Sequence, residues 1–101
     1  MLDNNGSSDI TQRRIYARRV MSNPTDHFRY DQPIDHPEVR YEWIEETIIE
    51  PYHQETDTDG SELYYGAVPG YRKWLKVVVL NGQIHSGYFD RRITKRLGAP
   101  T

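Results

Sequence analysis

Apolar positions follow the pattern of β-structure most clearly in the last third of the chain. Two short apolar-rich runs, residues 71–80 and 83–90, flank the dipeptide Asn81-Gly82. Short apolar runs bounded by turn residues are typical of strands, and Asn-Gly is the strongest short signal for a two-residue hairpin. We therefore predict a β-hairpin with a type I′ turn. Residues 62–68, which precede the Pro69-Gly70 turn, are predicted to form a further strand.

A two-residue turn also predicts the register of this hairpin, with Val79 opposite Ile84 and Val78 opposite His85. Side chains alternate between the two faces of a strand. One face is then expected to hold the apolar residues Leu75, Val77, Val79, Ile84 and Tyr88. The other is expected to hold Trp74, Lys76, Val78, His85 and Phe89. A bulge at Gly87, which has no side chain, would turn Tyr88 to this second face.

Helical periodicity is clearest over residues 35–50. Asp35 can cap a helix there, Pro37 suits a first turn, and Pro51 cannot continue it. The residues that recur on one face are Val39, Trp43, Ile44, Thr47 and Ile48. We expect this face to pack on the hairpin, with Trp43 buried against the sheet.

The first third of the chain carries weaker patterns. Residues 1–8 are polar and predict a disordered tail. Residues 10–21 are compatible with a short helix, and residues 14–20 equally with a strand. Residues 27–34 predict a short strand or an ordered loop.

Two further segments complete the predicted fold. Residues 52–61 are polar and acidic and predict a loop, and residues 91–101 predict a basic tail with one helical turn. The whole pattern predicts an α+β fold in which one main helix packs on a small twisted antiparallel sheet of three to four strands. We assign it to a single domain over residues 9–101.

Composition narrows the class of protein. A chain of 101 residues has room for one domain, and the absence of cysteine excludes disulfides and thiolate chemistry. No run approaches the ~20 apolar residues that a membrane-spanning helix needs. The N-terminus does not resemble a signal peptide, so a cytoplasmic location is the default expectation.

Charge is strongly segregated along the chain, although the net charge is only -2. Residues 1–25 carry a net +2, residues 26–62 carry -10 and residues 63–101 carry +6. Segregation of this kind predicts poles of opposite sign on the folded surface. Either the poles neutralise each other within the fold, or the basic pole meets an anion such as RNA.

The second face of the hairpin carries the first candidate site. Lys76 and His85 are expected to lie diagonally across two paired strands, close enough to act on one ligand. An imidazole with a near-neutral pKa and a cation can cleave a phosphodiester without metal. Arg91 would add charge at the phosphate, and His27 with Arg29 forms a second candidate catalytic group. The residues predicted to bind nucleic acid are Arg72, Lys73, Trp74, Phe89 and Arg92.

Other readings of these residues stay open. The second face could be an ordinary solvent face, and a helix or terminal segment covering it would favour a binding module over an enzyme. Residues 55–60 imitate the opening of a calcium loop but lack its closing glutamate. The four histidines have no zinc-ligand spacing, and no nucleotide-binding fingerprint is present. We therefore predict no metal and no cofactor.

Several short motifs carry a family resemblance over residues 27–92. They are His27-Phe28-Arg29, Pro51, Tyr64-Tyr65-Gly66, Pro69-Gly70, residues 75–79 and Ser86-Gly87-Tyr88. This pattern resembles small uncharacterised bacterial proteins related to the RelE/ParE-like toxin superfamily. The resemblance implies a fold related to the barnase-like ribonucleases and an mRNA-cleaving toxin silenced by an antitoxin protein. The superfamily also contains toxins that bind gyrase without cleaving RNA, so a non-catalytic binding module, a regulatory subunit docking a protein partner or a structural subunit stays an alternative.

Overall fold

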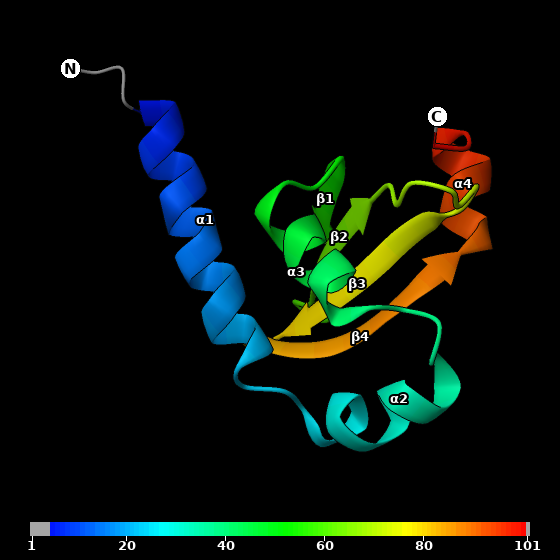
Figure 1. Cartoon of the computed structure of the whole chain (residues 1–101), viewed down its shortest axis with the longest axis horizontal. Helices are drawn as coiled ribbons and strands as arrows, with labels where there is room; N and C mark the ends of the chain where they lie inside the picture. The colour runs from blue at the N-terminus through cyan, green and yellow to red at the C-terminus, as the bar shows by residue number, and fades with distance from the viewer. Residues whose placement is uncertain (1–4, 101) are drawn as a thin grey trace.

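An antiparallel sheet of four strands forms the centre of the molecule in the computed structural model, which describes residues 5–100 and side chains from Asp9 onward. The strands follow each other in sheet order as they do in sequence (Figure 1). They are β1 (His53–Thr56), β2 (Glu62–Gly66), β3 (Trp74–Leu80) and β4 (Gln83–Asp90). The prediction of a small antiparallel sheet in an α+β fold is confirmed.

Several helices accompany this sheet, so the expectation of one main helix was wrong. The α-helices are α1 (Asn5–Met21), α2 (Gln32–Asp35), α3 (Tyr41–Ile49) and α4 (Arg91–Leu97). A π-helical turn, η1 (His27–Asp31), leads directly into α2. In Figure 1, α1 runs along one side of the molecule and projects beyond the sheet, and α4 lies at the opposite end.

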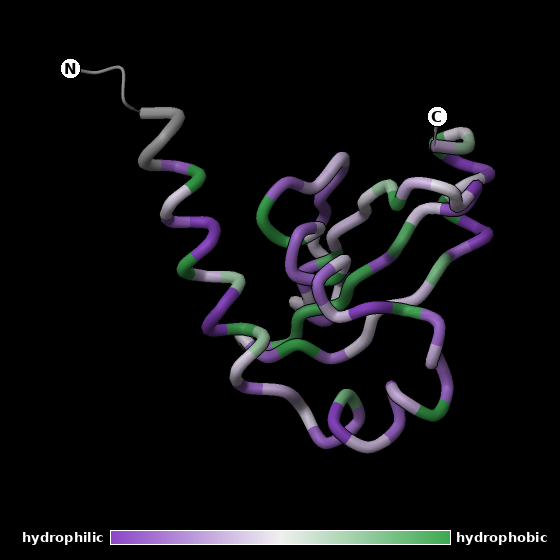
Figure 2. The backbone as a smooth tube through the Cα atoms, viewed as in Figure 1, coloured by the Kyte–Doolittle hydropathy of each residue, from purple (hydrophilic) through white to green (hydrophobic). Residues whose placement is uncertain are grey.

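The main core lies between the sheet and the helices α1 and α3. It buries Ala17 and Val20 of α1 and Ile44 and Ile48 of α3 against apolar side chains of the sheet. The buried residues of the sheet in this core are Tyr64, Leu75, Val77, Val79 and Ile84. Figure 2 shows the green apolar positions gathered along β3.

A second, smaller core lies under α4. Leu63, Tyr65 and Trp74 pack there with Ile93. Because β-strand side chains alternate, these residues belong to the sheet face that α1 and α3 leave uncovered. α4 covers only one end of that face, and Trp74 lies beneath it with 4% of its surface exposed.

The predicted hairpin is confirmed at its turn. Asn81 and Gly82 both have positive φ angles, 52° and 75°, as a type I′ turn requires. Val79 lies opposite Ile84 as expected. The next pair is Val78 with Ser86, because His85 is an additional residue that forms a β-bulge. The bulge is therefore at His85, two residues before the expected position at Gly87.

This bulge exchanges the faces of the residues that follow it. Tyr88 lies opposite Lys76 and Phe89 lies opposite Leu75, so the expected placement of Tyr88 and Phe89 was wrong. Gly87 now faces α3, where a Cβ atom would lie only 2.6 Å from Cδ1 of Ile44. The close contact with α3 requires a glycine at position 87. The alternation of apolar and polar residues along the hairpin did not predict this.

Trp43 packs differently from the prediction as well. Its indole is only partly buried, and it meets Tyr71 and Phe89 edge-on, with ring centroids 5.4 Å and 6.2 Å apart. Since the bulge brings Phe89 to the α3 side, aromatic rings fill the space beside Trp43. The completely buried residue of this helix is Ile44.

Residues 27–34 were predicted as a short strand or an ordered loop, and they are helical instead. Thr25 starts the π-helical turn: its hydroxyl accepts a hydrogen bond from the Phe28 N–H at 3.2 Å, and its carbonyl accepts one from Arg29. The buried Gln32 side chain then bonds both backbone groups of Gly87, at 2.6 Å and 3.1 Å. Gln32 thus occupies the place of a neighbouring strand at the outer edge of β4.

The helix predicted over residues 35–50 begins later than expected, at Tyr41. A residue that precedes proline is disfavoured in the α region, and His36 before Pro37 has φ -136° and ψ 60°. The chain therefore leaves helical geometry after Asp35 and re-enters it after Arg40. The end near Glu50 is confirmed.

Three smaller differences concern the ends of the chain and the acidic loop. β1 lies within the predicted loop 52–61, because its pairing with β2 outweighs its polar sequence. Residues 10–21 are helical, and this helix starts at Asn5. The predicted tail therefore loses residues 5–8, and the rest of it lies outside the described residues. The expected helical turn near the C-terminus is α4.

Candidate functional site

Two histidines from distant parts of the sequence meet at the bulge of β4. The rings of His27, on η1, and His85 stack with centroids 4.7 Å apart and an interplanar angle of 25°. His85 Nδ1 lies 3.0 Å from the hydroxyl of Thr25, and His27 Nδ1 lies 3.1 Å from a carboxylate oxygen of Asp31. Within the described residues no hydrogen bond engages either Nε2 atom. We refer to His27 and His85 as the histidine pair.

Local backbone features hold this pair in place. The Thr25 N–H donates to the carbonyl of Ile84 at 3.0 Å, which fixes η1 beside the bulged part of β4. His85 is the additional residue of the bulge, so its side chain is not committed to the regular alternation of the strand. π-Helical turns and bulges both occur frequently at functional sites.

The electrostatic surroundings favour a neutral His85. Partial burial lowers the pKa of His85, and the neighbouring His27 lowers it further, while Asp59 acts in the opposite direction. A histidine with a pKa below its ordinary value of about 6.5 is mostly unprotonated at pH 7. In the tautomer whose Nδ1–H donates to the Thr25 hydroxyl, neutral His85 accepts a proton through Nε2.

Three exposed arginines lie on η1 and in the last turn of α1, the helix that precedes it. Arg29 lies on the turn itself, and Arg18 and Arg19 lie in the last turn of α1. All three side chains are exposed, and no acid among residues 9–100 forms an ion pair with them. They supply positive charge close to the end of α1.

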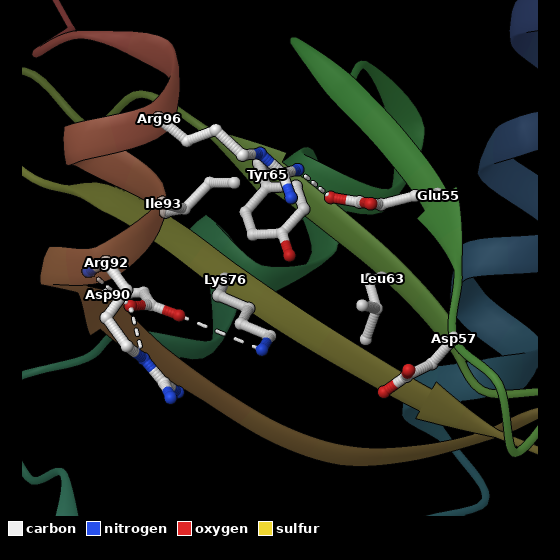
Figure 3. Close-up of a pocket in the computed structure, with 9 residues that line it drawn as sticks. All are labelled: Glu55, Asp57, Leu63, Tyr65, Lys76, Asp90, Arg92, Ile93 and Arg96. Carbon is white, nitrogen blue, oxygen red and sulfur yellow. Dashed lines mark hydrogen bonds and ion pairs between the residues drawn. The ribbon is translucent and has the colours of Figure 1, made fainter.

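Lys76 lies in a different environment, a pocket of about 420 Å³ between the open sheet face and α4 (Figure 3). Its Nζ atom is 3.7 Å from Oδ2 of Asp90, and the other carboxylate oxygen, Oδ1, lies 3.8 Å from Nε of Arg92. Arg96 at the rim pairs with Glu55 of β1. Each cation of this pocket, which we call the Lys76 pocket, is thus matched by a carboxylate.

Asp90 has a structural role in addition to this pairing. Its side chain is 7% exposed and accepts a hydrogen bond from the Arg92 N–H at 2.8 Å, which caps α4.

Burial raises the pKa of Tyr65, which also lines the Lys76 pocket, to about 12, and Glu55 adds to the effect. Tyr65 therefore remains a neutral hydroxyl across the physiological range.

Tyr88 is a residue of this face that sequence reasoning assigned to packing. The Lys76 ammonium lies 5.8 Å from the centroid of its ring, and His36 stacks on the ring at 5.4 Å. The position of the bulge decides this placement. The sequence offered only the general possibility that a bulge could turn Tyr88.

The predicted site residues thus fall into separate groups. His27 and His85 come together, and Arg29 lies on the same π-helical turn as His27, whereas Lys76 points toward Asp90 at the other end of β4. Trp74 is buried, stacks on Tyr52 and donates its indole N–H to the carbonyl of Gly98. Arg91 and Arg92 are exposed at the start of α4, and Arg72, Lys73 and Phe89 line a further pocket on the α3 side.

Neither a metal-binding cluster nor a similarity to known proteins assigns a function to the histidine pair or the Lys76 pocket. Among residues 9–100, no three His, Asp or Glu side chains are placed to hold a metal ion. No helix of the described part is long and apolar enough to cross a membrane. Comparison of the chain with protein-family models, curated proteins and solved structures returned no match.

Proposed function

We propose that this protein is a metal-independent endoribonuclease of the RelE-like toxin type, with the histidine pair as its proton-transfer groups. The observation that carries the proposal is the stacking of His27 and His85 at 4.7 Å. Each ring is oriented through Nδ1 by a neighbouring side chain, and each leaves Nε2 for a substrate. Cleavage of RNA at its own 2′-hydroxyl requires a base and an acid that both reach the same phosphodiester.

The two imidazoles take different roles in this reaction. Neutral His85 accepts the proton of a ribose 2′-hydroxyl, and the 2′-oxygen forms a bond to the adjacent phosphorus. The bond from phosphorus to the 5′-oxygen breaks, and protonated His27 gives its proton to the departing oxygen. The products are a 2′,3′-cyclic phosphate and a 5′-hydroxyl. Cations stabilise the charge that develops on the phosphate oxygens, and Arg29 lies on the same turn as His27.

Cleavage of a mixed RNA substrate in EDTA tests this proposal. His85→Ala and His27→Ala are each expected to lower the rate by about 10²–10⁴-fold, the range for loss of a general acid or base. His53→Ala is the matched control, because His53 is a partly exposed histidine that pairs with Glu55 on β1. Cleavage that survives both active-site substitutions would refute the assignment.

Separate variants test whether Lys76 and Arg91 contribute to the proposed cleavage. Lys76 pairs with Asp90 in this structure, so it contributes to catalysis only if substrate phosphate competes for its ammonium. A Lys76→Ala or Arg91→Ala loss of rate would add the affected cation to the site. An unchanged rate would restrict the site to the histidine pair and Arg29.

A second candidate function is a non-catalytic module that docks a protein partner. α4 covers one end of the open face and buries Trp74, and a covered face favours binding over catalysis. Exposed Glu50, just after α3, would attract a basic partner, and so would Glu42 and Glu46 of α3 where that partner replaces Arg40 and Arg14 in their ion pairs. Folded protein that cleaves no RNA but binds the product of an adjacent reading frame, such as an antitoxin, would favour this candidate.

A further inference from the structure

A second pocket lies on the α3 side of the sheet and contains three of the residues predicted to bind nucleic acid. It measures about 320 Å³ and is lined by Glu38, Tyr71, Arg72, Lys73 and Phe89. The rings of Tyr71 and Phe89 are stacked in it, with centroids 4.3 Å apart and planes within 6°. Trp43 meets both rings edge-on. Aromatic contacts therefore orient the ring of Tyr71 before any ligand binds.

Tyr71 nevertheless remains accessible. It is 38% exposed, although Phe89 covers one side of its ring. An aromatic ring that is held by its neighbours and still exposed loses little conformational entropy when a further ring stacks on it. Stacking of this kind accepts any nucleobase, because every base has a π-face.

Two cations, Arg72 and Lys73, and one carboxylate, Glu38, line the pocket beside Tyr71, so its net charge favours an anionic ligand. Arg72 and Lys73 follow Tyr71 directly, both are exposed, and no acid among residues 9–100 forms an ion pair with either. The cations of the Lys76 pocket, in contrast, are each held by Asp90 or Glu55. Arg72 and Lys73 are therefore available to phosphate groups without breaking an internal pair.

The pocket and the histidine pair both include a residue of strand β4. The chain from Thr25 to His36 follows the outer edge of β4, with contacts at Ile84, Gly87 and Tyr88. His85 and Phe89 are four residues apart on this strand, about 13 Å at the usual rise per residue.

We propose that Tyr71, Phe89, Arg72 and Lys73 form a base-stacking subsite for single-stranded RNA, which we call the Tyr71 platform. A base stacks on the exposed part of the Tyr71 ring, and Arg72 and Lys73 bind the adjoining phosphates. This deepens the proposed ribonuclease function and rests on RNA as its substrate. The platform binds substrate, and the histidine pair performs the chemistry.

The affinity of a fluorescent 2′-O-methyl RNA oligonucleotide, which cannot be cleaved at its 2′-oxygen, tests the platform. Tyr71→Leu is expected to weaken binding by about tenfold, the order of one lost stacking contact, and Tyr71→Phe is expected to bind like the wild type. Tyr52→Leu is the matched control, because Tyr52 is an exposed tyrosine stacked on Trp74 outside this pocket. The double variant Arg72→Ala/Lys73→Ala is expected to flatten the salt dependence of binding.

Three results would overturn the platform: no binding of the oligonucleotide, equal affinity of Tyr71→Leu and wild type, or an equal loss in Tyr52→Leu. If Tyr71→Leu unfolds, an unchanged salt dependence in the exposed double variant would overturn it instead. His85→Ala separates this proposal from the ribonuclease function, since it is expected to stop cleavage and leave binding intact. RNA binding that depends on Tyr71 in a protein without cleavage supports the platform alone. Cleavage without any dependence on Tyr71 supports the ribonuclease alone.

Discussion

The histidine pair and the Lys76 pocket lie near opposite ends of β4 and differ in how their titratable groups are satisfied. Each histidine has one nitrogen held by a neighbour and one without a partner in the described structure. In the Lys76 pocket, Lys76, Arg92 and Arg96 are all matched by carboxylates. The pair of Lys76 with the buried Asp90 holds structure together, whereas an oriented but unengaged nitrogen is available for chemistry. Both groups look alike in the sequence, as polar residues on or beside a strand.

The largest expected effect breaks the histidine pair. If His27 and His85 act as one unit, the double variant His27→Ala/His85→Ala is expected to lose about as much activity as either single variant, 10²–10⁴-fold. Single-turnover cleavage in EDTA measures this. Losses that multiply in the double variant would show that the two histidines act independently.

The next largest effect is a loss of stability, expected when the carboxylate of the Lys76 pocket is removed. Asp90→Ala leaves Lys76 half-buried without its partner and removes the cap of α4, so we expect a loss of about 3–5 kcal/mol in the free energy of unfolding. Urea unfolding measures it. Asp90→Asn keeps a capping oxygen and separates the two causes. The control is Glu55→Gln at the more exposed pair with Arg96, where less than about 1 kcal/mol is expected; equal losses at Glu55 and Asp90 would contradict the distinction.

A smaller loss of stability is expected from a substitution on β4, the strand whose register places both the histidine pair and the Lys76 pocket. Gly87→Ala puts a Cβ atom 2.6 Å from Cδ1 of Ile44, and relieving this overlap is expected to cost about 1–3 kcal/mol. Ile44→Val removes that Cδ1 atom, so the same substitution is expected to cost less in the Ile44→Val background. Thermal or urea unfolding of the four proteins gives the coupling energy. Additive losses would mean that the overlap is relieved elsewhere.

The smallest effect is the pH dependence of stability that His85 contributes. Its pKa is lowered in the folded state, so the unfolded chain binds the proton more tightly. The contribution of neutral His85 to the free energy of unfolding is fully present above the pKa of about 6.5 that the residue has in the unfolded chain. It is lost as the pH falls toward the lower pKa of His85 in the folded protein. The melting temperature is expected to fall between pH 7.5 and 5.5 by more in the wild type than in His85→Gln. An equal fall in both would assign the acid sensitivity to other groups.

Local signals allowed the sequence to predict much of the hairpin and of α3. The Asn81-Gly82 turn, the strand over residues 83–90 and the end of α3 before Pro51 depend on backbone preferences of a few neighbouring residues. Such preferences do not need the rest of the fold. His27, Arg29 and His85 were also identified as candidates from the sequence, because histidine and arginine suit phosphate chemistry wherever they lie.

Only the tertiary structure decided how these candidates combine. The pairing of Gln32 with Gly87 and the contact of Gly87 with Ile44 join residues far apart in the chain, and both involve the part of β4 that follows the bulge at His85. A bulge shifts every later residue of a strand to the opposite face, so one additional residue placed Tyr88 beside Lys76 and Phe89 beside Trp43. The sequence determined which chemical groups are present. Long-range packing determined which of them meet, because its contacts depend on partners that no local pattern encodes.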